Sequence, residues 1–148
     1  MKLLILSLFV VACAATSAPA VFISGVGSAP VMGGNDALSL DDPKLNELKW
    51  VAIKEINAKS KYPQNIVPGK ISKASSQVVG GIVYYFTLEA DLSNCLKTKV
   101  NHVQLKASKI CKAGPGAKHF EYELEVFLKA GEKKEIVTIK HTVESQVL

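Results

Sequence analysis

Arginine is absent from this chain of 148 residues. All 18 basic residues are lysines, against 13 acidic residues, and the net charge is +5. Sequence-specific nucleic-acid recognition relies on the bidentate fork of arginine, so this composition argues against a nucleic-acid partner. Five lysines between residues 99 and 118 form either a diffuse basic face or, as we prefer, an ordinary solvated surface: Lys99, Lys106, Lys109, Lys112 and Lys118.

Cysteine is scarce, with Cys13, Cys95 and Cys111 as its three positions. If Cys13 is lost with a secretory leader, an even pair remains in an oxidising compartment, which predicts a bridge between Cys95 and Cys111. Two buried free thiols are the alternative. Fifteen residues lie between the pair, and closing such a loop stabilises a fold by about 3 kcal/mol in the loop-entropy account.

Recognisable catalytic patterns are missing as well. The chain has no His-x-x-x-His zinc pattern and no glycine-rich phosphate loop, and its histidines are dispersed at positions 102, 119 and 141. The two remaining cysteines are better explained as a bridge than as a nucleophile beside a histidine. We therefore predict a protein that is not an enzyme and that holds no metal or cofactor.

The N-terminus is typical of a secretory signal peptide. Lys2 precedes an apolar core that runs to Ala15, and small residues allow cleavage after Ala15 or Ala20. A membrane anchor is the alternative, but this core is shorter than the ~20 residues that a spanning helix needs. We expect residues 1–20 to be removed and residues 21–148 to form one secreted domain with no membrane partner.

A helix is predicted after a flexible trunk that covers residues 21–34 and lacks charge. Asp42 can cap the helix, Pro43 suits its first position, and Tyr62-Pro63 ends it. Leu45, Leu48, Ala52 and Ile56 make a buried stripe with Val51 and Ile53 at its edges, while Lys44, Glu47, Lys54 and Asn57 are expected to face solvent.

Strands are predicted in the rest of the chain. Residues 82–88 are rich in β-branched and aromatic side chains and should pair with residues 70–76 across a tip at 77–81. Residues 120–128 alternate apolar and charged side chains, and residues 135–143 should return after a second tip at 130–133. The expected fold is α+β, with one long helix packed on a curved antiparallel sheet of four to five strands.

The first tip also carries a resemblance. Gln77-Val78-Val79-Gly80-Gly81 resembles the Gln-Val-Val-Ala-Gly loop of the cystatins, inhibitors of papain-like cysteine proteases, with Gly80 in place of alanine. A Gly33-Gly34 pair stands about 43 residues upstream, as in that family, and the predicted helix lies between the two. The resemblance extends over residues 31–143.

The resemblance implies a secreted, reversible and competitive inhibitor of cathepsin-type enzymes. Three segments would form an apolar wedge for the active-site cleft, with glycines that let the backbone approach the enzyme closely. They are the trunk at Val31, Met32, Gly33 and Gly34, the first tip at Gln77, Val78, Val79, Gly80 and Gly81, and the second tip at Ala130 and Gly131. A monomer is expected, and a domain swap through the first hairpin stays open.

Two departures from the family pattern matter. Ala130-Gly131 replaces the usual Pro-Trp of the second tip, and the second disulfide of the family's secreted vertebrate members has no counterpart here. Separately, Ser60-Lys61-Tyr62 lacks the asparagine of the family's legumain-binding loop, so legumain inhibition is not predicted. The first departure leaves an alternative, in which the chain is a cystatin-fold secreted binding or signalling protein that has lost inhibitory activity.

Overall fold

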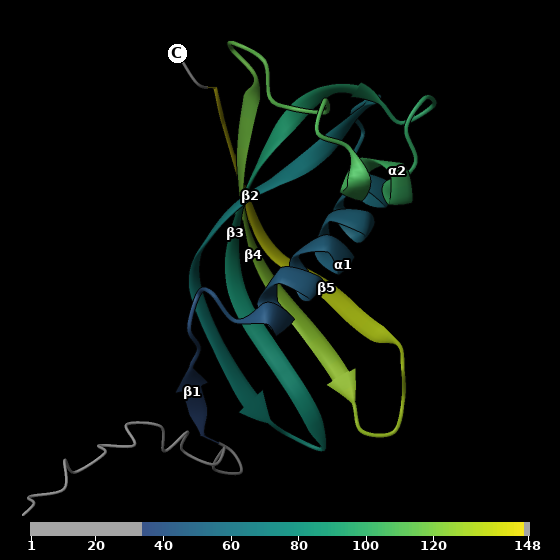
Figure 1. The fold of residues 1–148 in the computed structure, drawn as a ribbon. Helices are drawn as coiled ribbons and strands as arrows, with labels where there is room; N and C mark the ends of the chain where they lie inside the picture. Colours follow the sequence, from purple (N-terminus) through teal and green to yellow (C-terminus); the bar gives the residue numbers. More distant parts are fainter. Residues whose placement is uncertain (1–33, 147–148) are drawn as a thin grey trace, which may run out of the picture.

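The computed structural model describes residues 34–146, which form one helix-on-sheet unit (Figure 1). The elements follow in the order β1 (Asn35–Ala37), α1 (Pro43–Lys59), β2 (Gln64–Val78), β3 (Gly81–Leu96), α2 (His102–Ala107), β4 (Lys118–Lys129) and β5 (Glu135–Gln146). The five strands are antiparallel neighbours in the order β1-β2-β3-β4-β5. This arrangement confirms the α+β prediction. Neither helix of the described residues is long and apolar enough to cross a membrane.

Helix α1 begins as the sequence predicts. The side chain of Asp42 accepts a hydrogen bond from the backbone N–H of Lys44 at 2.7 Å, which satisfies one of the free donors at the helix start. The predicted stripe is buried against the sheet, and Ile53, expected at its edge, is fully buried with it. The same core contains Ile66 of β2 and seven buried side chains of β3 and β4: Phe86, Leu88, Ala90, Phe120, Tyr122, Leu124 and Val126.

The C-terminal end of α1 is held by two side chains. Asn57 was expected to face solvent, but it is half-buried and joins α1 to β2: its amide donates to the carbonyl of Ile66 at 2.9 Å and accepts from the Ile66 N–H at 2.7 Å. The Lys97 ammonium donates to the carbonyl oxygens of Asn57 and Ser60, at 2.6 and 2.9 Å. A cation at this end is also favoured by the helix dipole.

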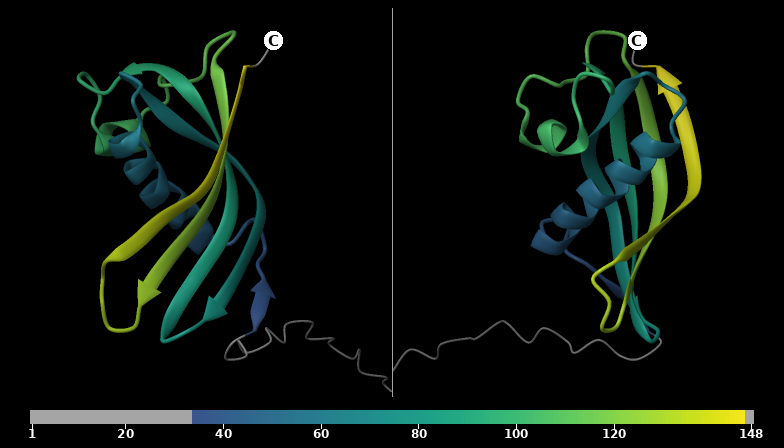
Figure 2. Two further views of the ribbon diagram at one scale, coloured as in Figure 1. Left: turned by 180° about the vertical axis from the view of Figure 1, so that it is seen from behind. Right: turned by 90° about the vertical axis from the view of Figure 1, so that its right-hand side faces the viewer.

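The sheet bends around α1 because its longest strands are irregular. The pairing of β2 with β3 shifts register on both sides of Ile71, next to Pro68 and Gly69 in the middle of β2. Proline lacks the N–H that a regular ladder needs, so it is tolerated in a strand at such an irregularity. Both views of Figure 2 show the resulting curved sheet with α1 against one of its faces.

A short helix, α2, lies between Cys95 and Cys111, where the sequence analysis predicted no helix. Asn101 accepts from the Gln104 N–H at 2.9 Å while the Gln104 side chain accepts from the Asn101 N–H at 3.0 Å, a reciprocal capping box. The ring of Trp50, which lies off the stripe of α1, packs edge-on against His102 with centroids 6.1 Å apart. Burial and the nearby Lys54 and Lys106 lower the pKa of His102.

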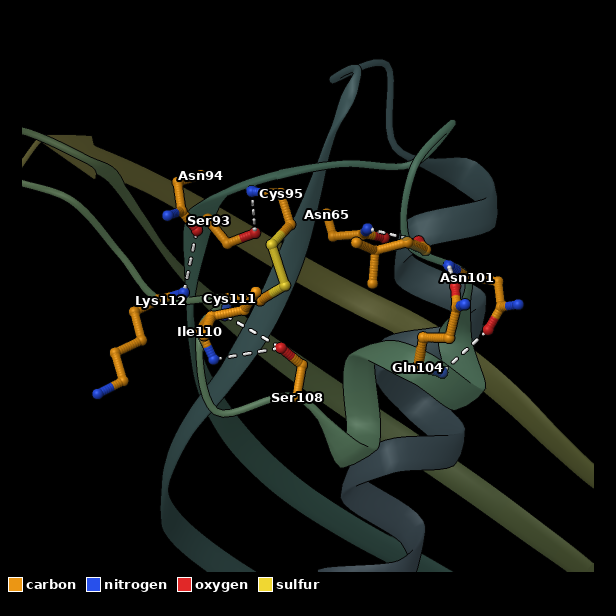
Figure 3. The surroundings of a disulfide bond; sticks show 11 residues. Asn65, Ser93, Asn94, Cys95, Asn101, Gln104, Ser108, Ile110, Cys111 and Lys112 are labelled. Atoms are coloured by element: carbon orange, nitrogen blue, oxygen red, sulfur yellow. Dashed lines mark hydrogen bonds between the residues drawn. A yellow bond between two sulfur atoms is a disulfide. The ribbon is translucent and has the colours of Figure 1, made fainter.

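The disulfide predicted from the cysteine count is present. Cys95 and Cys111 are bridged, with their Cα atoms 5.4 Å apart (Figure 3). The Asn94 N–H donates to the Lys112 carbonyl at 3.1 Å, and the Lys112 N–H donates to the Asn94 side-chain oxygen at 3.2 Å. A bridge between Ser93 and Ala113 fastens the same two chain segments. The segment from Lys97 to Lys112 is therefore closed at its base on β3.

Candidate functional site

Three segments that are far apart in the sequence meet at one end of the sheet, which we call the tip end. It comprises Gly34, residues 77–81 and residues 130–131. Asn35, the first residue of β1, pairs with Gln77, and Gly81 pairs with Lys129. The start of β1 and both hairpin tips accordingly point the same way, and the two tips protrude at the lower end of Figure 1.

The first tip is a tight turn with exposed apolar side chains. The Val79 N–H donates to the carbonyl of Gly81 at 3.0 Å, and Gly80 has φ +69°, a left-handed conformation that favours glycine. Val79 is 47% exposed and Val78 is half-buried. An isolated exposed valine is common, but here it stands at the end of a preformed loop.

Ile82 belongs to the same apolar surface and was not among the predicted site residues. It pairs with Val78 on one side and Leu128 on the other, so these three side chains form a row across three strands. Ile82 is 38% exposed. The sequence does carry a signal for it, because an apolar residue directly follows the glycine pair.

Gly81 is constrained by a contact inside the protein, which the sequence did not reveal. A Cβ atom at this position would lie 2.4 Å from the carbonyl oxygen of Leu128 and 2.7 Å from the ring of Phe127. The glycine is therefore required by the contact of β3 with β4 inside the protein. Gly80 has no atom within 4 Å of its ideal Cβ, so open space for a partner's backbone exists there and not at Gly81.

The second tip is polar. Lys129 and Glu132 form an ion pair at 2.5 Å, and the Glu132 N–H donates to the Lys129 carbonyl at 3.1 Å. Gly131 has φ +79°, and residues 130–134 are all exposed. Ala130 is the largest apolar side chain of this turn, and two exposed lysines, Lys133 and Lys134, follow it.

The trunk is described only in part. Gly34 is half-buried and leads directly into β1 beside Gln77. Val31, Met32 and Gly33 lie outside the described residues. The structure thus brings Gly34 and the two tips together.

A long helix across a curved antiparallel sheet, with two hairpin tips and the start of β1 at one end, defines a cystatin-like domain. Residues 33–126, more than half of the chain, match the Cystatin domain family. The chain belongs to the cystatin family.

Individual relatives agree with this assignment. "Cystatin-1" of Crotalus adamanteus is 31% identical over 87 residues, which are 59% of this chain and 63% of that protein. Among solved structures, "Crystal structure of Al-CPI" has a TM-score of 0.66 at 26% identity and covers 76% of this chain and 100% of that one. "Crystal structure of dimeric human cystatin F" has a TM-score of 0.62 at 15% identity, covers 86% of this chain and 98% of that one, and supports the fold alone.

Family membership bears on the class of activity. Cystatins are inhibitors of proteases rather than enzymes, and the family also contains members that do not inhibit. The match spans less than two thirds of the Crotalus protein. The target, the mechanism and the contacting residues of this chain are therefore matters of proposal.

Proposed function

We propose that this protein is a secreted, reversible, competitive inhibitor of papain-like cysteine proteases that inserts its tip end into the active-site cleft. The observation that supports this most is the convergence of Gly34, the first tip and the second tip at one end of the sheet. Protruding segments of this kind suit a partner that is itself concave, as a protease cleft is.

The first tip is the principal contact of the proposed complex. Its turn is formed before binding, so few backbone angles have to be ordered in the complex and little conformational entropy is lost. Val79 and Ile82 supply exposed apolar area on either side of the open space at Gly80. Burial of a valine side chain in the cleft contributes about 1.5 kcal/mol or more, which is roughly tenfold in affinity.

Secretion is part of the proposal. The N-terminal apolar core is typical of a cleaved leader, and the Cys95–Cys111 disulfide is of the kind that persists in oxidising compartments. We expect the mature inhibitor to begin at residue 16 or 21 and to act as a monomer. N-terminal sequencing of protein recovered from the medium of expressing cells tests the cleavage.

Titration of a papain-like enzyme with that secreted protein tests the function. The apparent inhibition constant should rise linearly with substrate concentration, and the inhibitor should be recovered uncleaved after long incubation. Absence of inhibition at micromolar concentrations would overturn the proposal. Inhibition that does not depend on substrate concentration would overturn the competitive mechanism.

A pair of matched variants assigns the contact. Val79→Ser changes the first tip, and Val143→Ser changes a valine of the same 47% exposure on β5. Loss of one apolar contact predicts inhibition weakened about tenfold for Val79→Ser and unchanged for Val143→Ser. Equal inhibition by the two variants would show that the first tip is not in the interface.

One observation favours a second candidate function. The second tip offers no large apolar side chain and is dominated by Lys129, Glu132, Lys133 and Lys134. A cystatin-fold binding or signalling protein without inhibitory activity would tolerate such a tip. It is distinguished by a normal fold together with no inhibition in the titration above.

A further inference from the structure

The segment between the two disulfide cysteines concentrates positive charge. Between Asp91 and Glu121 the chain contains six lysines and no acidic residue. Lys97 and Lys118 are engaged in contacts with Ser60 and Glu144. The remaining four are exposed and have no ion-pair partner among residues 34–146: Lys99, Lys106, Lys109 and Lys112.

The same segment exposes two aliphatic side chains to an unusual degree. Val103 is 77% exposed and Ile110 is 78% exposed, more than any other large apolar residue described. Val103 is one turn from Lys106 on α2, and Ile110 lies between Lys109 and Lys112. Each aliphatic side chain therefore has lysines beside it.

These side chains stand on a rigid base. The Cys95–Cys111 bridge closes the segment, the capping box at Asn101 fixes the start of α2, and Asn65 donates to the Val100 carbonyl at 2.9 Å. Figure 3 shows the Lys112 side chain extending away from this framework. Exposed aliphatic groups held on a fixed framework are not explained by folding, since none of them contributes to the core.

We propose that residues 99–112 form a docking surface for an anionic lipid membrane, with Val103 and Ile110 entering the interfacial layer and the four lysines facing lipid head groups. Lysines interspersed with exposed aliphatic residues are the composition of surfaces that lie on such membranes. A sulfated polysaccharide would use the charge but not the two aliphatic side chains. The sequence analysis predicted no membrane partner, because sequence patterns indicate segments that span a membrane. The exposure of Val103 and Ile110 is a property of the fold and was not visible in the sequence.

The surface lies away from the tip end. Gln64 pairs with Leu96 at one end of the β2–β3 ladder and Val78 pairs with Ile82 at the other, roughly 45 Å apart along a strand of this length. Figure 1 shows α2 near the first of these ends and the hairpin tips at the second. A protein docked through residues 99–112 keeps its tip end free, so membrane docking does not depend on the inhibitory function.

Co-sedimentation of the disulfide-bonded secreted protein with vesicles tests the surface. We expect binding to phosphatidylserine–phosphatidylcholine vesicles, weakened by added salt, and no binding to vesicles of phosphatidylcholine alone. Because each lysine near an anionic surface contributes roughly fivefold, Lys109→Gln with Lys112→Gln should weaken binding about 25-fold. Failure of the unaltered protein to bind anionic vesicles at physiological ionic strength overturns the proposal.

Two further variants separate lipid docking from a general effect of charge. Val103→Ser with Ile110→Ser keeps every lysine and should weaken vesicle binding about tenfold or more, since burial of aliphatic groups is lost. Lys70→Gln with Lys73→Gln removes the same charge from exposed positions on β2 and should leave binding nearly unchanged. Equal loss of vesicle binding in this control would overturn the lipid assignment in favour of net charge. Vesicle binding that is unchanged in the serine variant, together with heparin binding equal to that of the parent, would overturn it in favour of a polyanion.

Discussion

Substitution of Gly81 by alanine should destabilise the protein more than the same change at Gly80. At Gly81 the new methyl group would lie 2.4 Å from the Leu128 oxygen and 3.1 Å from the Lys129 Cα, both backbone atoms. Neither can move aside as a flexible side chain would. The β3–β4 ladder has to separate at the tip end to admit the group.

The expected magnitude follows from this geometry. Forcing an extra carbon into a packed contact costs about 1–3 kcal/mol. At Gly80 the methyl group meets open space but adopts φ +69°, which costs about 1–2 kcal/mol. The reduced entropy of the unfolded chain contributes about 0.4–1 kcal/mol to both variants, so it cancels in their difference. Because the close atoms are backbone atoms, Gly81→Ala lies at the upper end of its range, about 3 kcal/mol, and we expect it to be less stable than Gly80→Ala by roughly 1–2 kcal/mol.

Urea unfolding of the two variants, with thermal unfolding as a second measure, is the assay. A difference of 1–2 kcal/mol corresponds to about 4–10 °C in Tm for a domain near 100 residues. Hydrogen exchange should locate the change of Gly81→Ala at the pairing of Gly81 with Lys129. If Gly81→Ala is as stable as Gly80→Ala, the close contact between β3 and β4 does not constrain this position and the reasoning is refuted.

Three other changes have defined outcomes. Ala130→Trp supplies the missing apolar area without altering Gly131, the left-handed glycine that follows it. It should tighten inhibition by up to ~30-fold through a slower off-rate. An unchanged off-rate of the protease complex would place the second tip outside the interface. Cys95→Ser with Cys111→Ser should remove about 3 kcal/mol of stability and lower the Tm, while inhibition at low temperature persists, and an unchanged Tm would contradict this. A hydrogen bond from Lys118 lowers the pKa of Glu144 below its ordinary 4.5. The contact therefore stabilises the fold fully above about that pH and is lost as the pH falls through the lowered pKa. The Tm difference between Glu144→Gln and the parent should narrow as the pH falls below about 4.5 and close below the lowered pKa, and a difference that persists in strong acid would refute this.

Local patterns in the sequence predicted the main elements well. The apolar stripe of α1 and the alternation of residues 120–128 are periodic signals, and both correspond to buried faces in the structure. The cap at Asp42 depends on residues next to each other in the chain. Such features need no knowledge of distant contacts.

Features set by distant contacts were missed. Asn57 looked like a solvent-facing helix residue, and only its position beside Ile66 reveals that it joins two elements. The partner of Trp50 is His102, more than fifty residues later. The collision at Gly81 involves β4, so neighbouring residues could not show it.

Helix α2 was not predicted either, although a local signal for it exists in the sequence. Asn101 and Gln104 stand at the spacing of a capping box, but the six residues that follow give too short a window for an apolar period. For the candidate site, the sequence indicated the two tips. Ile82 was missed although an apolar residue directly follows the glycine pair, because its exposure depends on the position of the strand end.

The pairing of β1 with β2 has a consequence for how the trunk would act. Three residues of β1 hold the chain against Ser75, Ser76 and Gln77. Gly34 precedes this anchor directly, and three residues of chain link Met32 to Asn35, a reach of about 11 Å at most. In the proposed complex, the trunk would therefore meet a protease already held by the first tip at a high effective concentration, as a tethered second ligand rather than a free one. Residence time, more than the rate of encounter, is the property that β1 would govern in that complex.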